Sequence, residues 1–239
     1  MRRRILGIIG IVATTLATAP SLEGSGQDDR ATVRPAEIRK ILFLGNSITR
    51  HPPRPEIDWH DDWGMAATSA DKDYVHLVAA EVGRRTGKPP EILVKNIADF
   101  ERGYSDYDVD AKLKDAFAFD ADLFVLAIGE NVPEFKTDAD ADRFEASVAK
   151  ILAGVRARRQ PIILVRGCFW PSEARDARLR KASEAAGARF IEISSLGRDP
   201  SNAARSERSF KHEGVASHPG DRGMKAIAEA ILAALDQTR

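Results

Sequence analysis

The sequence predicts an α/β fold in three layers, in which a five-stranded parallel sheet lies between helices on both faces. Two observations lead to this prediction. Short, continuous apolar runs of the kind found in buried parallel strands recur along the chain. Segments whose apolar residues follow a helical period separate these runs.

The expected strands are the apolar runs themselves. The first run ends in Gly45, where the backbone can turn sharply, and the third is the longest. The five strands are expected at residues 41–44, 92–94, 123–128, 162–165 and 190–193. In sheets of this kind ligands bind beyond the carboxyl ends of the strands, so functional residues are sought just after each run.

Helices are expected in the segments between the strands. The apolar residues from Tyr74 to Val82 follow a helical period that continues up to Gly87, and a longer amphipathic pattern covers residues 144–155. The remaining helices are expected at about 111–117, 172–186 and 221–235.

Composition fits a single globular domain and excludes several classes of protein. Of 239 residues, 43% are hydrophobic and 30% are charged, which is too apolar for a disordered chain. The 36 basic and 36 acidic residues balance, so no basic excess indicates a nucleic-acid partner. A lone cysteine, Cys168, excludes an internal disulfide framework and a multi-cysteine metal site.

The first residues read as a signal peptide over residues 1–19. Three arginines precede an apolar run at 5–18 that is shorter than a membrane span, and small residues lead up to Ala19. Residues 20–37 are expected to be a linker and 38–239 the folded domain. We therefore expect an exported protein, periplasmic or secreted, that keeps no membrane anchor after cleavage.

Three polar residues stand where strands end or where the last helix begins. Ser47 follows the first strand, Asn131 follows the third, and His218 precedes the last helix. Together they offer a nucleophile, an amide donor for an oxyanion and a general base. Each also has a structural alternative: a helix-capping serine, an Asx turn, and a surface histidine beside the natural cap Asp221.

The other histidines compete for the same role, although His76 falls inside a helical pattern. His51, His60, Asp61 and Asp62 are conceivable metal ligands, but their spacing matches no known metal motif. We therefore expect no metal and no cofactor.

The order of these features resembles the SGNH hydrolases, also called GDSL-like esterases. Residues 45–49 are similar to the first block of that family, with Asn46 in place of its aspartate. Residues 129–131 are similar to the third block, with Val132 in place of its last aspartate, and His218 with the following proline is similar to the fifth. The resemblance spans residues 38 to about 235 and implies a flavodoxin-like SGNH hydrolase fold.

Two further segments indicate a branch within this family. Residues 62–67 together with 73–76 are similar to an exported bacterial branch of the family.

The resemblance implies a serine esterase that hydrolyses an acyl ester, with acetyl the expected acyl group. Ser47 would be the nucleophile and one oxyanion donor, Asn131 would donate its side-chain amide, and His218 would be the general base. The expected partner is a small-molecule or carbohydrate ester.

Two positions depart from the family pattern. Glu101 stands where the family has an oxyanion-hole glycine, although the backbone N–H of Glu101 could still serve. Val215 stands where the family has the aspartate that orients the histidine. A backbone carbonyl is the favoured replacement, with Glu213 or a carboxylate of residues 59–63 as alternatives. A degenerate, non-catalytic carbohydrate-binding domain and an acyltransferase remain as alternative functions.

Aromatic residues near the strand ends favour a carbohydrate substrate. Trp59, Trp63, Trp170 and Tyr104 would stack on sugar rings, or else cover the edge of a small core.

Charged residues in the same regions would add polar contacts to a hydroxylated substrate. Glu101, Glu130, Arg102 and Arg166 are the candidates, and Glu130 is expected beside a solvated loop. Substrate binding is thus expected of Glu101, Glu130, Trp63 and Trp170.

Overall fold

The computed structural model describes residues 33–238, and its centre is one sheet of five parallel strands. The strand order is β2-β1-β3-β4-β5, in which the chain winds outward in both directions from β1. The strands are β1 (Lys40–Gly45), β2 (Glu91–Asn96), β3 (Leu123–Ala127), β4 (Ile162–Arg166) and β5 (Arg189–Ile191). All five predicted strands and the three-layer α/β fold are confirmed.

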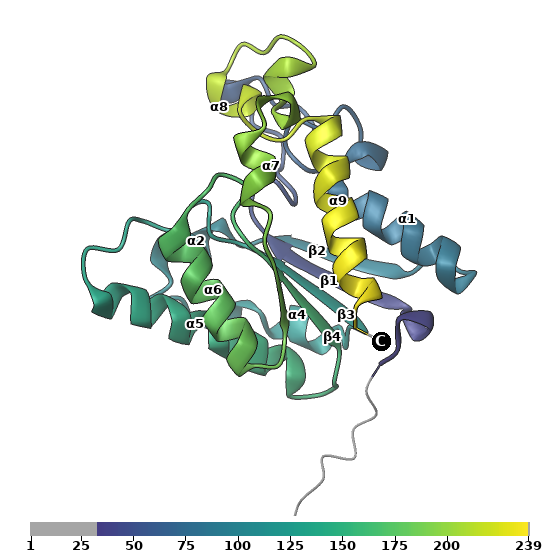
Figure 1. The fold of residues 1–239 in the computed structure, drawn as a ribbon, viewed down its shortest axis with the longest axis vertical. Helices are drawn as coiled ribbons and strands as arrows, with labels where there is room; N and C mark the ends of the chain where they lie inside the picture. The colour runs from purple at the N-terminus through teal and green to yellow at the C-terminus, as the bar shows by residue number, and fades with distance from the viewer. Residues whose placement is uncertain (1–32, 239) are drawn as a thin grey trace, which may run out of the picture.

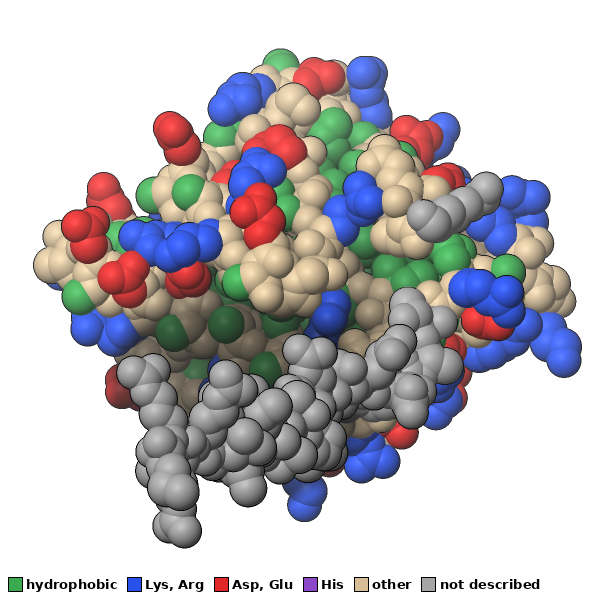
Figure 2. Space-filling model, turned by 60° about the horizontal axis from the view of Figure 1, so that its bottom comes forward, with side chains coloured by type: hydrophobic (Ala, Val, Ile, Leu, Met, Phe, Trp, Pro, Cys, Tyr) green, Lys and Arg blue, Asp and Glu red, His purple; other side chains and the backbone are tan. Residues whose placement is uncertain are grey.

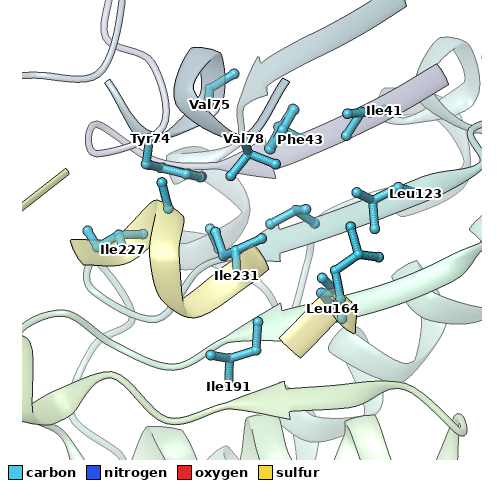
Figure 3. Close-up of a cluster of buried hydrophobic side chains, with 14 of the residues drawn as sticks. Ile41, Phe43, Tyr74, Val75, Val78, Leu123, Leu164, Ile191, Ile227 and Ile231 are labelled. Carbon is cyan, nitrogen blue, oxygen red and sulfur yellow. The ribbon is translucent and has the colours of Figure 1, made fainter. Parts of the chain in front are cut away.

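Helices α1 (Tyr74–Thr86) and α9 (Asp221–Asp236) cover one face of the sheet. Alternate residues of each strand point to this face, and Ile41 and Phe43 of β1 belong to it. The ring of Tyr74 packs edge-on against Phe43 with centroids 6.1 Å apart. Figure 3 shows how α1 and α9 bring Val78 and Ile231 into the same apolar cluster.

The opposite face is covered by α5 (Asp138–Arg156), α6 (Glu173–Ala185) and two short helices, α3 (Val109–Lys112) and α4 (Lys114–Ala118). Here the other residues of β1, Leu42 and Leu44, meet Phe144 and Leu152 of α5. A single helix was predicted at 111–117, but α3 and α4 divide at Leu113.

Short helices lie between and after the strands, and the sequence did not predict them. They are α2 (Ala98–Gly103), α7 (Ser194–Arg198) and α8 (Glu213–Ala216). Within residues 33–238 five 3-10 turns accompany them: η1 (Pro35–Glu37), η2 (Pro55–Ile57), η3 (Ala70–Lys72), η4 (Pro200–Asn202) and η5 (Ala204–Ser206). Elements of one turn or so are too short to show a hydrophobic period.

A small third apolar cluster lies beside the ends of the strands. It joins two segments that are far apart in the sequence and consists of Trp59, Met65, Ala66, Ala204 and Val215. The region of α7 and α8 stands at the top of Figure 1, above the sheet. Val215, one of the two positions that depart from the resemblance, is buried in this cluster.

The expected signal peptide at 1–19 lies outside the described residues, and so does most of the expected linker. In the described part of that linker, η1 is a 3-10 helix. Val33 is buried in the apolar cluster between the sheet and helices α1 and α9, which we call the first core. Between residues 33 and 238, no helix is both long and apolar enough to cross a membrane. Figure 2 shows basic and acidic side chains interspersed over the face that it brings forward.

Candidate active site

Ser47 lies in a tight turn at the carboxyl end of β1. The Asn46 carbonyl accepts from the N–H groups of Thr49 and Arg50, each at 3.0 Å, and the Asn46 side chain accepts from the N–H of residue 48 at 3.1 Å. A Cβ at Gly45 would collide with the Thr49 side chain and the Ala127 carbonyl, so only glycine fits there. The turn therefore holds Ser47 at the edge of the sheet.

Ser47 meets His218 from the loop before α9. The distance from Ser47 Oγ to His218 Nε2 is 2.8 Å. The other ring nitrogen, Nδ1, lies 2.7 Å from the carbonyl oxygen of Gly214. Because a carbonyl can only accept, Nδ1 carries a proton, and Nε2 is left to accept the proton of the Ser47 hydroxyl. The predicted meeting of Ser47 and His218 is confirmed.

The group that orients His218 is thus the backbone carbonyl that the sequence favoured. Val215 is turned into the third apolar cluster, and Glu213 forms an ion pair with Arg205. The carboxylate of Asp62 is held by Arg50. The hydrogen-bond partners of the His218 ring within residues 33–238 are Ser47 and Gly214, so neither Glu213 nor Asp61 or Asp62 orients it.

The ring of His218 is largely withdrawn from water. Burial lowers its pKa to about 4, although the hydrogen bond to the Gly214 carbonyl acts in the opposite direction. The ring of Trp170 packs edge-on against it with centroids 5.1 Å apart. His218 is therefore neutral at physiological pH, as a proton acceptor must be.

Asn131 extends from the end of β3 into the same cleft, and its carboxamide is held at both ends. Its Nδ2 donates to Glu101 Oε2 at 2.7 Å, and its Oδ1 accepts from Arg102 Nη2 at 3.2 Å. One N–H of the amide is used in this way, which leaves the second available. Among residues 33–238 the backbone N–H of Ser47 also has no acceptor.

The backbone N–H of Glu101 is not a free donor. It lies 3.4 Å from the Ile97 carbonyl at the first turn of α2, so the expectation that it could serve the oxyanion is wrong. The side chain of Glu101 instead points beneath Asn131. Its Oε1 accepts from the N–H groups of Gly129 at 2.6 Å and Asn131 at 3.3 Å, and from Asn46 Nδ2 at 3.1 Å.

Glu130 is the second buried carboxylate under the cleft. Its oxygens accept from Asn46 Nδ2 and Arg166 Nη1, each at 2.6 Å, and from the N–H of Phe169 at 2.9 Å. The side chains of Glu130 and Arg166 are 2% and 0% exposed. Asn46 links Glu130 to Glu101, so these four side chains, Asn46, Glu101, Glu130 and Arg166, form one buried network.

The two carboxylates of the buried network have opposite pKa shifts. Burial raises the pKa of Glu101, and the nearby charge of Glu130 raises it further. Burial also acts to raise the pKa of Glu130, but the charge and hydrogen bond of Arg166 outweigh burial and hold it below its usual value. The network therefore keeps Glu130 ionised beside Arg166.

The sequence expected both glutamates to contact substrate, and this expectation is wrong. Glu101 is 0% exposed, and every hydrogen bond of Glu101 and Glu130 goes to protein groups beneath the cleft. The side chain of Glu130 is buried although the loop that follows it is exposed at residues 133 and 134. The carboxylates support the residues of the cleft instead of lining it.

The tryptophans mainly cover the core, which was the alternative reading. Trp63 is half-buried against the first core and donates to the Ala67 carbonyl at 3.0 Å. Trp59 and Tyr104 are buried. Trp170 is half-buried against the first core and packs beside His218, and substrate contact stays a prediction for Trp63 and Trp170.

Ser47, Asn131 and His218 line one open cleft of about 680 Å³. The sequence missed most of its other residues, and only Arg102 had been named as a polar contact. The remaining lining residues are His51, Pro52, Arg54, Ile57, Met65, Asn96, Ala98, Asp99, Arg102, His212, Gly214 and Val215. Residues 51–63 reach the cleft because this segment folds back on itself through isolated antiparallel bridges. No local sequence pattern predicts these bridges.

The considered metal ligands do not come together. Nδ1 of His51 contacts the Pro52 carbonyl at 2.7 Å, and His60 lies 3.4 Å from Asp58. Between residues 33 and 238, no group of three or more histidine, cysteine, aspartate or glutamate side chains is arranged to hold a metal ion.

Comparison with known proteins places the fold. No family model and no curated protein sequence matches the chain. Among solved structures, one described as a GDSL-like lipase from Bacteroides ovatus superimposes with a TM-score of 0.54 at 16% identity, over 84% of this chain and 99% of that one. The chain has the fold of the SGNH, or GDSL-like, hydrolases.

Two further structures agree with this SGNH fold. A GDSL-like lipase from Bacteroides uniformis gives a TM-score of 0.54 at 13% identity, over 84% of this chain and 96% of that one. A family two carbohydrate esterase from Clostridium thermocellum, in complex with cellohexaose, gives a TM-score of 0.53 at 15% identity, over 83% of this chain and 64% of that one.

Proposed function

We propose that this protein is a serine ester hydrolase that works through an acyl-enzyme on Ser47. The observation that carries the proposal is the 2.8 Å contact between Ser47 Oγ and a His218 ring whose other nitrogen is held by the Gly214 carbonyl. Nε2 takes the hydroxyl proton as Oγ attacks the ester carbonyl, and the same proton leaves with the alcohol. Water, activated by Nε2 in turn, releases the acid and restores Ser47.

The tetrahedral intermediate needs donors for its oxyanion. The Ser47 N–H and the second N–H of the Asn131 amide are available in the cleft, and Glu101 and Arg102 hold that amide in one orientation. An amide fixed before the reaction stabilises the developing charge without reorganising at the moment of reaction.

The Gly214 carbonyl replaces the usual aspartate. It selects the tautomer of His218 in which Nε2 can accept a proton. This orientation supports a hydrolase over a non-catalytic binding domain, because a domain that only binds sugar does not require it. An acyltransferase would use the same acyl-enzyme, with an alcohol in place of water.

The substrate we propose is an acyl ester, with acetyl as the acyl group and a carbohydrate as the alcohol. The cleft of about 680 Å³ is large enough for a sugar-sized group, and its lining carries many polar side chains. The structural neighbour in complex with cellohexaose supports a carbohydrate.

We further propose that residues 1–19 direct export and are removed, leaving the domain from residue 38 outside the cytoplasm. The amino-terminal sequence of the protein recovered from the periplasm or the medium tests this, and it should begin close after Ala19.

A serine-directed fluorophosphonate tests the catalytic proposal directly. It should label Ser47, and the Ser47→Ala variant should neither take the label nor hydrolyse an aryl acetate. Ser172→Ala is the matched control, since the Ser172 side chain makes no capping hydrogen bond, and this variant should behave as the parent. Labelling that persists in Ser47→Ala would refute the assignment.

A further inference from the structure

The cleft at Ser47 is more positive than the protein as a whole. The chain has equal numbers of basic and acidic residues, yet the charged residues lining the cleft are Arg54, Arg102 and one acid, Asp99. The Asp99 carboxylate lies 3.2 Å from Lys112 Nζ, which offsets its charge. Two guanidinium groups therefore face a cleft without an equal negative charge.

Arg102 has no acidic partner among residues 33–238. Its Nη2 donates to the Asn131 amide oxygen at 3.2 Å, which is an uncharged acceptor. Arg54 comes no closer than 4.0 Å to Glu56, the outer limit of an ion pair. By contrast, Arg50 beside the cleft is bound by both oxygens of Asp62, at 2.8 and 2.6 Å.

Both charges act on another residue of the cleft, His51. Burial is the first cause of the lowered pKa of His51, and Arg54 and Arg102 each lower it further. Both guanidinium groups are therefore close enough to His51, which lines the same cleft, to influence its charge.

We propose that the cleft binds an acyl ester that also carries a carboxylate, and that Arg102 and Arg54 hold this carboxylate while Ser47 attacks the ester. The planar guanidinium matches a carboxylate with two parallel hydrogen bonds, which a neutral hydroxyl cannot provide. This inference rests on the proposed hydrolase and specifies its substrate class, for example an acylated acidic sugar.

Two small esters that differ in charge test the proposal: meta-acetoxybenzoate and the neutral meta-acetoxybenzamide. The quantity measured is the ratio of kcat/KM for the anionic ester to that for the neutral one. The parent protein should give a ratio of about ten, and salt should reduce it. Arg54→Gln and Arg102→Gln should each lower the ratio, and the double variant should bring it close to one.

Arg84→Gln is the matched control, because Arg84 lies on α1 outside the cleft and its loss changes the net charge equally. Its ratio should equal that of the parent. Hydrolysis of both esters at equal kcat/KM by the parent would overturn the carboxylate proposal and leave the hydrolase standing. A ratio that stays high in the double variant would overturn it as well. If neither ester is hydrolysed and the fluorophosphonate does not label Ser47, the proposed function itself fails.

Discussion

Two polar regions meet at the carboxyl end of the sheet, and they are built in opposite ways. The Ser47–His218 pair is open: it faces a cleft, and the Ser47 N–H has no acceptor among residues 33–238. The buried network beneath it is closed, because the oxygens of Glu101 and Glu130 accept hydrogen bonds from N–H groups of five residues: Asn46, Gly129, Asn131, Arg166 and Phe169. The open region is free to bind and react, whereas the closed region keeps the strand ends in place.

The contrast makes different predictions for the two regions, and the largest effect is expected in the open one. His218→Ala should lower kcat for an aryl acetate by roughly a thousandfold or more, because His218 is the base that is hydrogen-bonded to Ser47 Oγ. The loss of unfolding free energy should be smaller than the one predicted for the closed region, because no buried charge is left unpaired. Steady-state kinetics measure kcat, and circular dichroism during unfolding measures stability. A loss of stability as large as that of the closed region would contradict the difference between the two regions.

In the closed region the expected effect is on stability. Glu130→Ala leaves the buried Arg166 charge unpaired, and breaking a buried pair in this way costs about 3–5 kcal/mol of unfolding free energy. Urea denaturation measures it. The exposed Glu134→Ala is the control and should stay close to the parent. Equal unfolding free energies for the two variants would contradict the structural role of the network.

Asn131 connects the regions, and its loss should slow the reaction. Asn131→Ala removes one oxyanion donor, so kcat should fall by about a hundredfold, or about 3 kcal/mol, while KM changes far less. A rise in KM at constant kcat would assign Asn131 to substrate binding in place of transition-state stabilisation.

Glu101 should act through Asn131. In Glu101→Gln the new amide nitrogen faces Asn131 Nδ2, so two donors oppose each other and the Asn131 amide turns. We expect kcat to fall by about tenfold with KM nearly unchanged.

A double-mutant cycle checks this route. Adding Glu101→Gln to Asn131→Ala should cause no further loss of kcat, because the amide that Glu101 orients is already absent. An additive loss would mean that Glu101 affects the reaction by another path.

The smallest effect is expected from pH. Since the pKa of His218 is lowered to about 4, kcat/KM should stay nearly constant through the mildly acidic range and fall as pH drops through about 4. The same shift means that the unfolded chain binds the proton first, so the stability contributed by neutral His218 is present above the ordinary histidine pKa and declines as pH falls from there toward 4. A pH–rate profile that falls near pH 6.5, the ordinary pKa of histidine, would contradict the burial of this ring.

The sequence by itself determined the sheet and the meeting of Ser47, Asn131 and His218. Apolar runs separated by helical periods allow little besides a parallel sheet, and residues that follow parallel strands must gather at one edge. Local patterns were sufficient for the strands and helices because each depends on residues close together in the chain. The parallel topology then brings Ser47 and Asn131 to one edge, and the resemblance to the SGNH hydrolases implied that His218 joins them.

Only the tertiary structure decided which groups surround these three residues. Glu101 and Glu130 were expected to contact substrate, but both side chains are buried and bonded to groups distant in the sequence, such as Asn46 and Arg166. Likewise Val215 packs in an apolar cluster, and the Gly214 carbonyl accepts the hydrogen bond that orients His218. Burial and hydrogen-bond partners depend on segments that meet only when the chain folds, so no local pattern records them.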